Sequence, residues 1–260
     1  MGHKNVRGDF AARMISAAHA PSWKEHLGAL PLCAPEDVVG TRNLLVIAPH
    51  PDDETLGCGG LLAWAVASGR QARVVVLTDG ERSHPGSAEF PPSRLAAIRR
   101  NEALDAGAGL GLSHDDYVFL HLADGSLDSL TPPKANLVVR SLRRWIRALA
   151  PVVVCVTASS DMHGDHRAAH ALALAAIRDA VDCTLLSYPV WSWLAPPATR
   201  LPSGRRIDIT RYRDAKQAAI QTHASQLGGL IDDATDPFEL PAELLECVDR
   251  NYEVLLDESV

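Results

Sequence analysis

The segment APHPDDE, residues 48–54, places one imidazole and three carboxylates within a few positions of one another. It follows the apolar run NLLVI (43–47) and precedes a stretch rich in glycine, alanine and leucine. Three carboxylates crowded at the end of a buried strand repel one another and lose hydration energy unless a cation lies among them. The pattern therefore indicates a metal site.

Two other interpretations explain this segment less well. A helix N-terminus favours a capping aspartate and tolerates acids, but that accounts for one acid and not for all three in HPDDE (50–54). A dinucleotide loop at 57–60 would have the spacing G-x-G-G rather than G-x-G-x-x-G. The preceding carboxylates would also repel a pyrophosphate from the backbone N–H groups it needs.

A second cluster, HGDH (163–166), can complete a metal site. His50 and Asp53 offer one nitrogen and one oxygen, so a third protein ligand must come from elsewhere in the chain. Two nitrogens and one oxygen with open positions suit a catalytic Zn²⁺, and the same set resembles the facial triad that binds Fe²⁺. His170 lies one helical turn further on, and we expect it behind the ligands or on the surface.

Short apolar runs rich in valine and leucine recur from residue 43 onward and show little alternation, which is typical of strands buried on both faces. Helical stretches separate them, so the pattern predicts parallel strands joined by right-handed crossovers. We expect strands at 43–49, 72–80, 117–122, 151–157 and 183–189, helices at 58–69, 93–107, 133–150 and 166–180, and one more strand and helix within 205–226.

The predicted fold class is α/β, with a single Rossmann-like domain and a mostly parallel sheet that carries helices on both faces. Residues 1–40 are expected to form an irregular or partly helical lead-in, and 41–260 the domain itself. Open sheets of this kind bind ligands at the carboxyl ends of their strands, where the strand order reverses. HPDDE follows the first predicted strand and SSDMHGDH (159–166) follows the fourth, so we expect the two loops to converge there.

The composition of the chain argues against nucleic acid and membrane lipids as binding partners. The chain has 260 residues, a formal net charge of −7, 47% hydrophobic and 22% charged residues, which is ordinary for a globular protein and leaves no electrostatic footprint for nucleic acid. The longest uncharged runs, 55–69 and 183–199, are interrupted by glycines or prolines, so we expect no membrane span. We expect no signal peptide, and five cysteines without a C-x-x-C pair favour the cytoplasm. The sequence leaves open whether the chain forms a homo-oligomer.

Together, APHPDDE and H-x-D-H resemble the LmbE-like family of metal-dependent de-N-acetylases, also called PIG-L deacetylases. Members of that family remove acetyl groups from N-acetylated amino sugars. Pro49 is a single insertion relative to the family spelling A-H-P-D-D-E, and it should leave the His-to-Asp spacing intact. The similarity covers about residues 43–226, with weaker support from TDGE (78–81), R-x-x-E (99–102), FLHLADG (119–125) and THASQ (222–226).

The resemblance implies a role for several residues. His50, Asp53 and His166 would be the metal ligands, with Zn²⁺ expected and Fe²⁺ or another divalent ion open. Asp52 would be the general base, and His163 the general acid or the partner of the oxyanion.

Three further residues receive roles in the same way. Asp165 would orient an imidazole through its free ring N–H, as carboxylates behind a metal site do. Arg99 and Asp124 match positions that hold sugar hydroxyls.

Aromatic residues could add a surface for the sugar ring. Trp191 and Trp193 are one residue apart on a strand-like segment, so we expect them to face the same side. The sequence does not decide whether Trp191, Trp193 or His223 contacts the substrate.

The implied reaction is zinc-dependent hydrolysis of the acetamide of a small N-acetylated amino-sugar conjugate, which releases acetate and a free amine. Two alternatives stay open: a metal-dependent hydrolase of another bond, such as a glycosylamine or an ester, and a non-catalytic sugar-binding relative. Neither the sugar nor the group attached to it can be named from the sequence.

Overall fold

A computed structural model of the chain describes residues 22–178, 180–196 and 201–257. Residues 1–21 of the predicted lead-in lie outside the described residues. The remainder of the lead-in forms two short helices and a strand, and that strand pairs with the main sheet. The division at residue 40 stays a prediction.

The described strands form one mixed, mostly parallel eight-stranded sheet in the order β1-β7-β8-β6-β5-β2-β3-β4. Strand β8 runs antiparallel to its neighbours β6 and β7, and the other pairs are parallel. The strands are β1 Leu32–Cys33, β2 Asn43–Ala48, β3 Ala72–Thr78, β4 Tyr117–Leu122, β5 Val152–Thr157, β6 Cys183–Tyr188, β7 Gly204–Asp208 and β8 Tyr252–Asp257.

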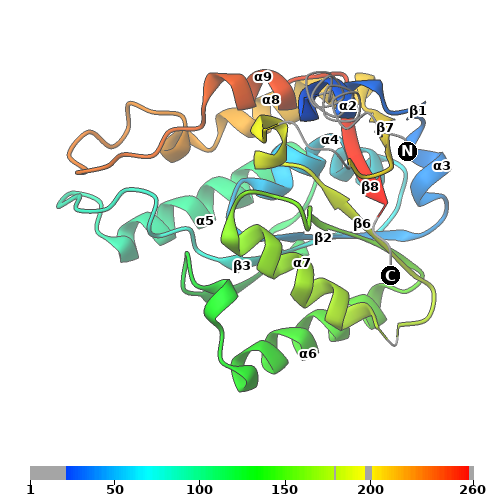
Figure 1. Ribbon diagram of the computed structural model, residues 1–260, viewed down its shortest axis with the longest axis horizontal. Coiled ribbons are helices and arrows are strands. Elements are labelled where there is room, and N and C mark those ends of the chain that lie inside the picture. Colours follow the sequence, from blue (N-terminus) through cyan, green and yellow to red (C-terminus); the bar gives the residue numbers. More distant parts are fainter. Residues whose placement is uncertain (1–21, 179, 197–200, 258–260) are drawn as a thin grey trace, which may run out of the picture.

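Helices cover both faces of this sheet, as the sequence predicts (Figure 1). The α-helices are α2 Trp23–Ala29, α3 Pro35–Val39, α4 Asp53–Ala67, α5 Pro92–Gly109, α6 Pro132–Leu149, α7 Gly164–Ile177, α8 Arg213–Gln221 and α9 Ala242–Val248. Short 3₁₀ turns occur at η1 His114–Asp116, η2 Leu127–Ser129, η3 Trp191–Leu194, η4 Thr210–Tyr212 and η5 Ala224–Gln226. Helices α6 and α7 pack on one face, and α4, α5 and α8 pack on the other (Figure 1).

Two hydrophobic cores lie on the two faces of the sheet because successive strand residues point to opposite sides. In β2, Leu44 and Val46 pack under α4 and α8, whereas Leu45 and Ile47 pack against α6 and α7. All four side chains have no exposed area. Burial on both faces explains why these strands read as continuous apolar runs rather than as alternating ones.

The strand order reverses between β2 and β5. From β2 the chain proceeds through α4 to β3 on one side, and from β5 it proceeds through α7 to β6 on the other. The loops after β2 and β5 therefore leave the sheet side by side, which is where ligands bind in open α/β sheets.

One prediction of local structure is wrong in detail, and two elements of the C-terminal segment were not predicted. Helix α4 begins at Asp53 and not at residue 58, so the acids of HPDDE form its N-terminal turn. The C-terminal segment contributes α9 and the antiparallel strand β8, neither of which the sequence patterns predict. Antiparallel β8 inserts between β6 and β7, and its residues fill the core on the α4 face.

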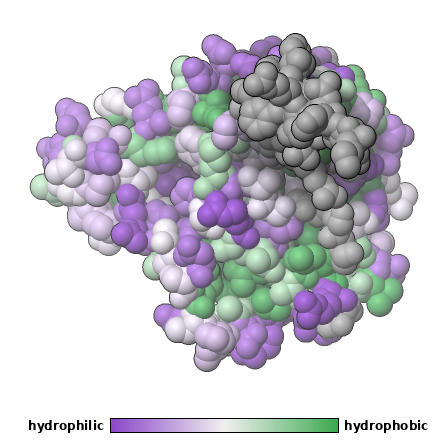
Figure 2. All heavy atoms as spheres, viewed as in Figure 1, coloured by the Kyte–Doolittle hydropathy of each residue, from purple (hydrophilic) through white to green (hydrophobic). Residues whose placement is uncertain are grey.

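Two long loops project from one end of the molecule, the one between β3 and α5 and the one between η5 and α9 (Figure 1). Figure 2 shows that their exposed side chains are mainly hydrophilic, whereas hydrophobic side chains gather over α7. Within the described residues, every helix is too short or too polar to cross a bilayer.

Candidate active site

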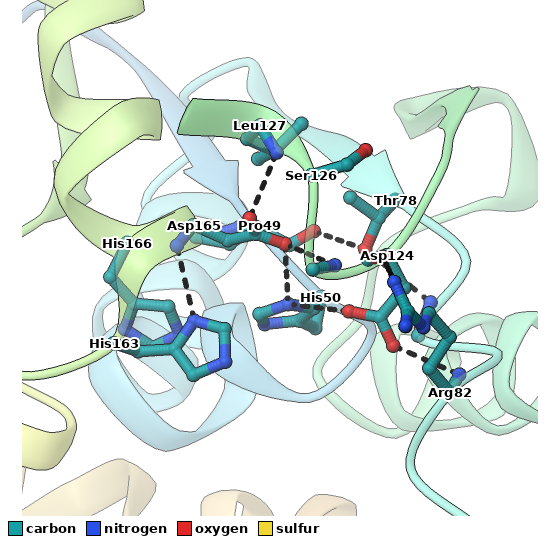
Figure 3. Close-up of polar contacts among 12 residues, drawn as sticks. Pro49, His50, Thr78, Arg82, Asp124, Ser126, Leu127, His163, Asp165 and His166 are labelled. Atoms are coloured by element: carbon teal, nitrogen blue, oxygen red, sulfur yellow. Dashed lines mark hydrogen bonds and ion pairs between the residues drawn. The ribbon is translucent and has the colours of Figure 1, made fainter. Parts of the chain in front are cut away.

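The two ligand-rich loops meet at the carboxyl ends of β2 and β5 (Figure 3). His50 lies just beyond β2, His163 caps the N-terminus of α7, and His166 lies in the first turn of that helix. The three imidazoles each place a ring nitrogen within 4.8 Å of the others. Pro49 is held in place because its carbonyl oxygen accepts hydrogen bonds from the backbone N–H and the hydroxyl of Thr78, both at 2.9 Å.

Asp53 joins two of these imidazoles. Its Oδ2 lies 3.1 Å from His50 Nδ1 and 3.3 Å from His166 Nε2. Ligands that bind one zinc ion at about 2.05 Å in tetrahedral geometry lie about 3.3 Å apart. The two distances from Asp53 Oδ2 to the imidazole nitrogens of His50 and His166 therefore match the spacing of ligands on a single divalent ion.

Each of the two histidines has a carboxylate behind the ring nitrogen that faces away from Asp53. His50 Nε2 lies 3.2 Å from Asp124 Oδ1 and 3.3 Å from Asp165 Oδ2, and His166 Nδ1 lies 3.4 Å from Asp161 Oδ1. Such carboxylates hold the ring proton on the far nitrogen and leave the other lone pair free for a metal. The Nε2 of buried His166 has no hydrogen bond of normal geometry to the described residues, which favours a metal as its missing partner.

The same carboxylates change the protonation of the cluster. Burial disfavours the His166 cation, but Asp53 and Asp161 outweigh burial and raise the pKa of His166 to about 9. Burial likewise opposes the charge of Asp53, yet the two imidazoles hold its pKa well below the usual range. Without a cation the cluster thus retains protons, which a metal ion would displace.

Asp52 lies beside this cluster with only 5% of its surface exposed. Burial raises the pKa of Asp52 to about 7, although the Arg99 guanidinium lowers it and Asp53 raises it further. A carboxylate with a pKa near 7 can both accept and return a proton at neutral pH.

Arg99, predicted as a sugar-binding residue, lies against Asp52. Its Nη2 donates to Asp52 Oδ2 at 3.1 Å and to the carbonyl oxygen of Pro51 at 2.8 Å, and its Nη1 donates to that of Gly80 at 2.9 Å. Gly80 has a φ of +63°, and a Cβ there would lie 2.1 Å from the guanidinium, so only glycine leaves room for it. The Nε of Arg99 is buried without a partner among the described residues.

Asp165 connects the histidines to the loop that carries Asp124 (Figure 3). Its carboxylate accepts the backbone N–H groups of Gly125 at 2.8 Å and Leu127 at 2.9 Å, and it also contacts His50. The imidazole that Asp165 contacts through its side chain is therefore that of His50. Asp124 in turn accepts the backbone N–H of Arg82 at 3.0 Å, and His50 holds the pKa of Asp124 below its usual range against the effect of burial.

His163 has a different environment. Its Nδ1 accepts the backbone N–H of Asp165 at 3.2 Å, so the proton of the neutral ring lies on Nε2. Burial and the neighbouring His50 and His166 lower the pKa of His163. His163 is therefore suited to donate a hydrogen bond as a neutral imidazole.

The cluster borders a cavity of about 390 Å³, which His50, Asp52, Asp53 and His163 line directly. Trp191 and Phe238 also line this cavity, and their rings meet edge to face at 6.0 Å.

The expectation that Trp191 and Trp193 share one face of a strand is wrong. Both residues lie in the 3₁₀ turn η3. There Trp191 lines the cavity, whereas Trp193 is buried in the core. A turn of this kind sends neighbouring side chains in different directions, so only one of the two tryptophans reaches the site.

The two projecting loops join to form the rim of this cavity. Asp233 accepts hydrogen bonds from the Ser87 hydroxyl and from the backbone N–H groups of Ala88 and Glu89. The backbone N–H of Phe238 donates to the carbonyl oxygen of Ser83 at 3.2 Å. Hydrogen bonds thus join the loop 228–240 to the loop that follows β3.

The remaining sequence candidates lie behind the cavity. His223 is buried, with Nε2 3.2 Å from the Thr55 hydroxyl, and His170 Nδ1 lies 3.2 Å from the carbonyl oxygen of Thr157. Neither lines the cavity.

Sequence reasoning missed Asp161 and Gln226. Asp161 stands two residues before HGDH, and a carboxylate this close to the motif is the signal that could have found it. Gln226 ends THASQ, lines the cavity and is fully buried.

Comparisons with known proteins show what this chain is similar to. The family model PIG-L, described as GlcNAc-PI de-N-acetylase, matches residues 45–177. A 1D-myo-inositol 2-acetamido-2-deoxy-alpha-D-glucopyranoside deacetylase from Mycobacteroides abscessus is 29% identical in an alignment of 233 residues. The alignment covers 72% of this chain and 82% of the relative.

Two solved structures are also similar. A conserved protein from Thermus thermophilus is 34% identical with a TM-score of 0.55, covering 72% of this chain and 80% of that protein. The N,N'-diacetylchitobiose deacetylase from Pyrococcus horikoshii is 20% identical with a TM-score of 0.57, covering 94% of this chain and 84% of that one. At this lower identity the second likeness concerns the fold alone.

Proposed function

Since this chain belongs to the PIG-L family of de-N-acetylases, we propose that it hydrolyses the acetamide of an N-acetylated amino-sugar conjugate and releases acetate and a free amine. The observation that carries the proposal is the convergence of His50, Asp53 and His166 beside Asp52 and His163 at one cavity. The named activity of the Mycobacteroides relative supports an N-acetylglucosamine unit as the reacting sugar.

His50 Nδ1, Asp53 Oδ2 and His166 Nε2 would hold one divalent ion. Two nitrogens and one oxygen suit Zn²⁺, and Fe²⁺ can use the same donors. The ion supplies a Lewis acid that polarises the acetamide carbonyl and lowers the pKa of water.

Asp52 acts as the general base in this proposal. It takes a proton from the attacking water and returns that proton to the leaving nitrogen. Arg99 orients the carboxylate while it does so. Amide hydrolysis needs such a proton because an amine leaves poorly as an anion.

His163 stabilises the tetrahedral intermediate. Because its Nδ1 accepts a backbone N–H, the Nε2–H is available to the developing oxyanion. Asp165 holds the loop and the His50 ring that surround the reacting carbonyl.

The sugar contacts predicted for Arg99 and Asp124 remain part of the proposal. Both residues line the cavity, and Asp124 retains acceptor capacity for a hydroxyl beyond its present contacts. Trp191 supplies an aromatic surface on which a sugar ring can stack.

A panel of substrates tests the function. Purified protein with Zn²⁺ or Fe²⁺ should release acetate from at least one N-acetylglucosamine conjugate, and should release little from acetyl-lysine peptides. Hydrolysis of esters or glycosylamines without acetate release would favour a different hydrolase. Binding of the sugars without turnover under any metal would indicate a non-catalytic relative.

A further inference from the structure

The backbone of Asp52 has a conformation that residues with a Cβ rarely adopt. Its φ is +133° and its ψ is −30°, at the turn between β2 and α4. This conformation is disfavoured and persists only where neighbouring groups enforce it. It turns the chain so that the Asp52 carboxylate faces the cavity beside Asp53.

The side chain of Glu54 binds the backbone of this turn. Its Oε2 accepts the backbone N–H of Asp52 at 3.1 Å, and its Oε1 accepts the hydroxyl of Tyr117 at 3.4 Å. The Glu54 side chain has no exposed area. Tyr117 reaches it across α5, where a Cβ at Gly107 would lie 2.4 Å from the tyrosine ring.

An ordinary helix cap does not explain this arrangement. Asp52 is the N-cap residue of α4, yet its own side chain makes no capping hydrogen bond because it faces the cavity. A general attraction to the helix N-terminus would be satisfied by an acid at the surface. Instead a carboxyl is buried, at a cost in hydration, with one oxygen directed at the N–H of the strained residue.

We propose that Glu54 is a positioning residue for the reaction: it binds the Asp52 backbone N–H and so holds the base in its strained conformation. The inference rests on the proposed function, in which Asp52 moves the proton. Arg99 holds the carboxylate of Asp52 and the carbonyl oxygen of Pro51, and Glu54 holds the N–H between them. The base is thus restrained on both sides before substrate arrives.

The test compares two substitutions of Glu54 that differ in one property. Glu54→Gln retains an oxygen that can accept the Asp52 N–H, whereas Glu54→Leu has a similar size and no acceptor. We expect Gln to keep kcat near the parent value. Leu should lower kcat by roughly 10- to 100-fold, as small misplacements of catalytic groups do. KM and the metal content should stay near the parent values in both variants.

Two structural measurements do not depend on activity. Crystal structures should show φ of Asp52 retained in the Gln variant and changed in the Leu variant. In the parent protein the amide hydrogen of Asp52 should exchange slowly with solvent. This measurement uses the parent protein alone, so it can be made even if the Leu variant does not fold.

Rapid exchange of that amide in the parent would overturn the inference. So would a folded, metal-loaded Leu variant with the parent kcat and the parent φ at Asp52. If the parent releases no acetate from any sugar, the proposed function fails, while the crystal structures and the exchange rate still decide whether Glu54 holds Asp52.

Discussion

Arg99 Nη2 lies 3.1 Å from Asp52 Oδ2, and the same guanidinium binds the carbonyl oxygens of Pro51 and Gly80. Both side chains are nearly fully buried. Arg99 therefore holds the orientation of the carboxylate that we assign as the base through Nη1 and Nη2, and its Nε has no partner among the described residues.

Arg99→Lys should separate this role from sugar binding. A lysine ammonium cannot span two carbonyl oxygens and a carboxylate as the planar guanidinium does. We expect kcat to fall by roughly 10²-fold through misplacement of Asp52, with a smaller change in KM. Steady-state kinetics on the best substrate measures the split, and a rise in KM at constant kcat would instead indicate a role in sugar binding alone.

Asp52 and Asp53 are neighbours with different expected functions. Asp52→Asn should keep the metal and slow turnover by roughly 10²–10⁴-fold, the usual effect of losing a positioned proton acceptor. Asp53→Asn should weaken metal binding, because Asp53 Oδ2 faces both His50 and His166. Elemental analysis together with kinetics decides between them, and the reverse pattern would exchange the two roles.

The three clustered imidazoles allow a sharper test of the ligand set. His166→Ala should abolish most metal binding, whereas His163→Ala should retain close to one equivalent and lose most of kcat. The reason is that His163 Nδ1 already accepts a backbone N–H, whereas a carboxylate stands behind each of the rings of His50 and His166. Loss of metal from the His163 variant would point to a site with three histidine ligands.

Asp124 should contribute to recognition of the sugar. Asp124→Ala should lower kcat/KM by about 1–3 kcal/mol of transition-state binding, the cost of leaving a polar partner unpaired. Because Asp124 also contacts His50, the metal content of the variant must be measured alongside. An Asp124→Ala enzyme with parent kinetics at full metal loading would remove this residue from the recognition site.

The free energy of unfolding should decrease as the pH falls, because His223 is buried in its neutral form. Burial, with a further contribution from Arg99, lowers the pKa of His223 to about 3 from its ordinary value of 6.5. The unfolded chain then binds a proton that the folded chain refuses, so stability declines as pH falls below about 6.5, by at most about 1.4 kcal/mol per pH unit. His223→Gln should reduce the loss of Tm between pH 7 and pH 5, and an unchanged loss would contradict this assignment.

Much of this architecture could be predicted from the sequence because its strands are buried on both faces. The run at 43–49 and the run at 151–157 have the same pattern, and they become the adjacent strands β2 and β5 that carry the two motifs. The position of the site follows from that adjacency. The sequence pattern places the start of helix α4 too late because its first turns contain Asp53, Thr55 and three glycines, which are weaker helix formers.

The C-terminal part could not be predicted in the same way. Strand β8 and the loop 228–240 depend on contacts with distant segments, such as the pairing of β8 with β6 and of Thr235 with Pro85. The partner of Arg99 could not be predicted from the sequence either. The position of Arg99 on α5 is visible in the sequence, but the choice between Asp52 and a sugar as its partner depends on how α5 packs against the turn after β2.

The cavity described above is built from two separate stretches of the chain. The residues assigned to chemistry, from His50 to His166, fall within the part that the family model matches, whereas the lining residues Trp191, Gln226 and Phe238 fall beyond it. The loop 228–240 supplies Asp236, Pro237, Phe238 and Leu240 to the cavity and none of the residues assigned to chemistry. Under the proposed function, exchanging this loop for that of a relative therefore tests whether it selects the group attached to the sugar, while every residue assigned to the reaction stays the same.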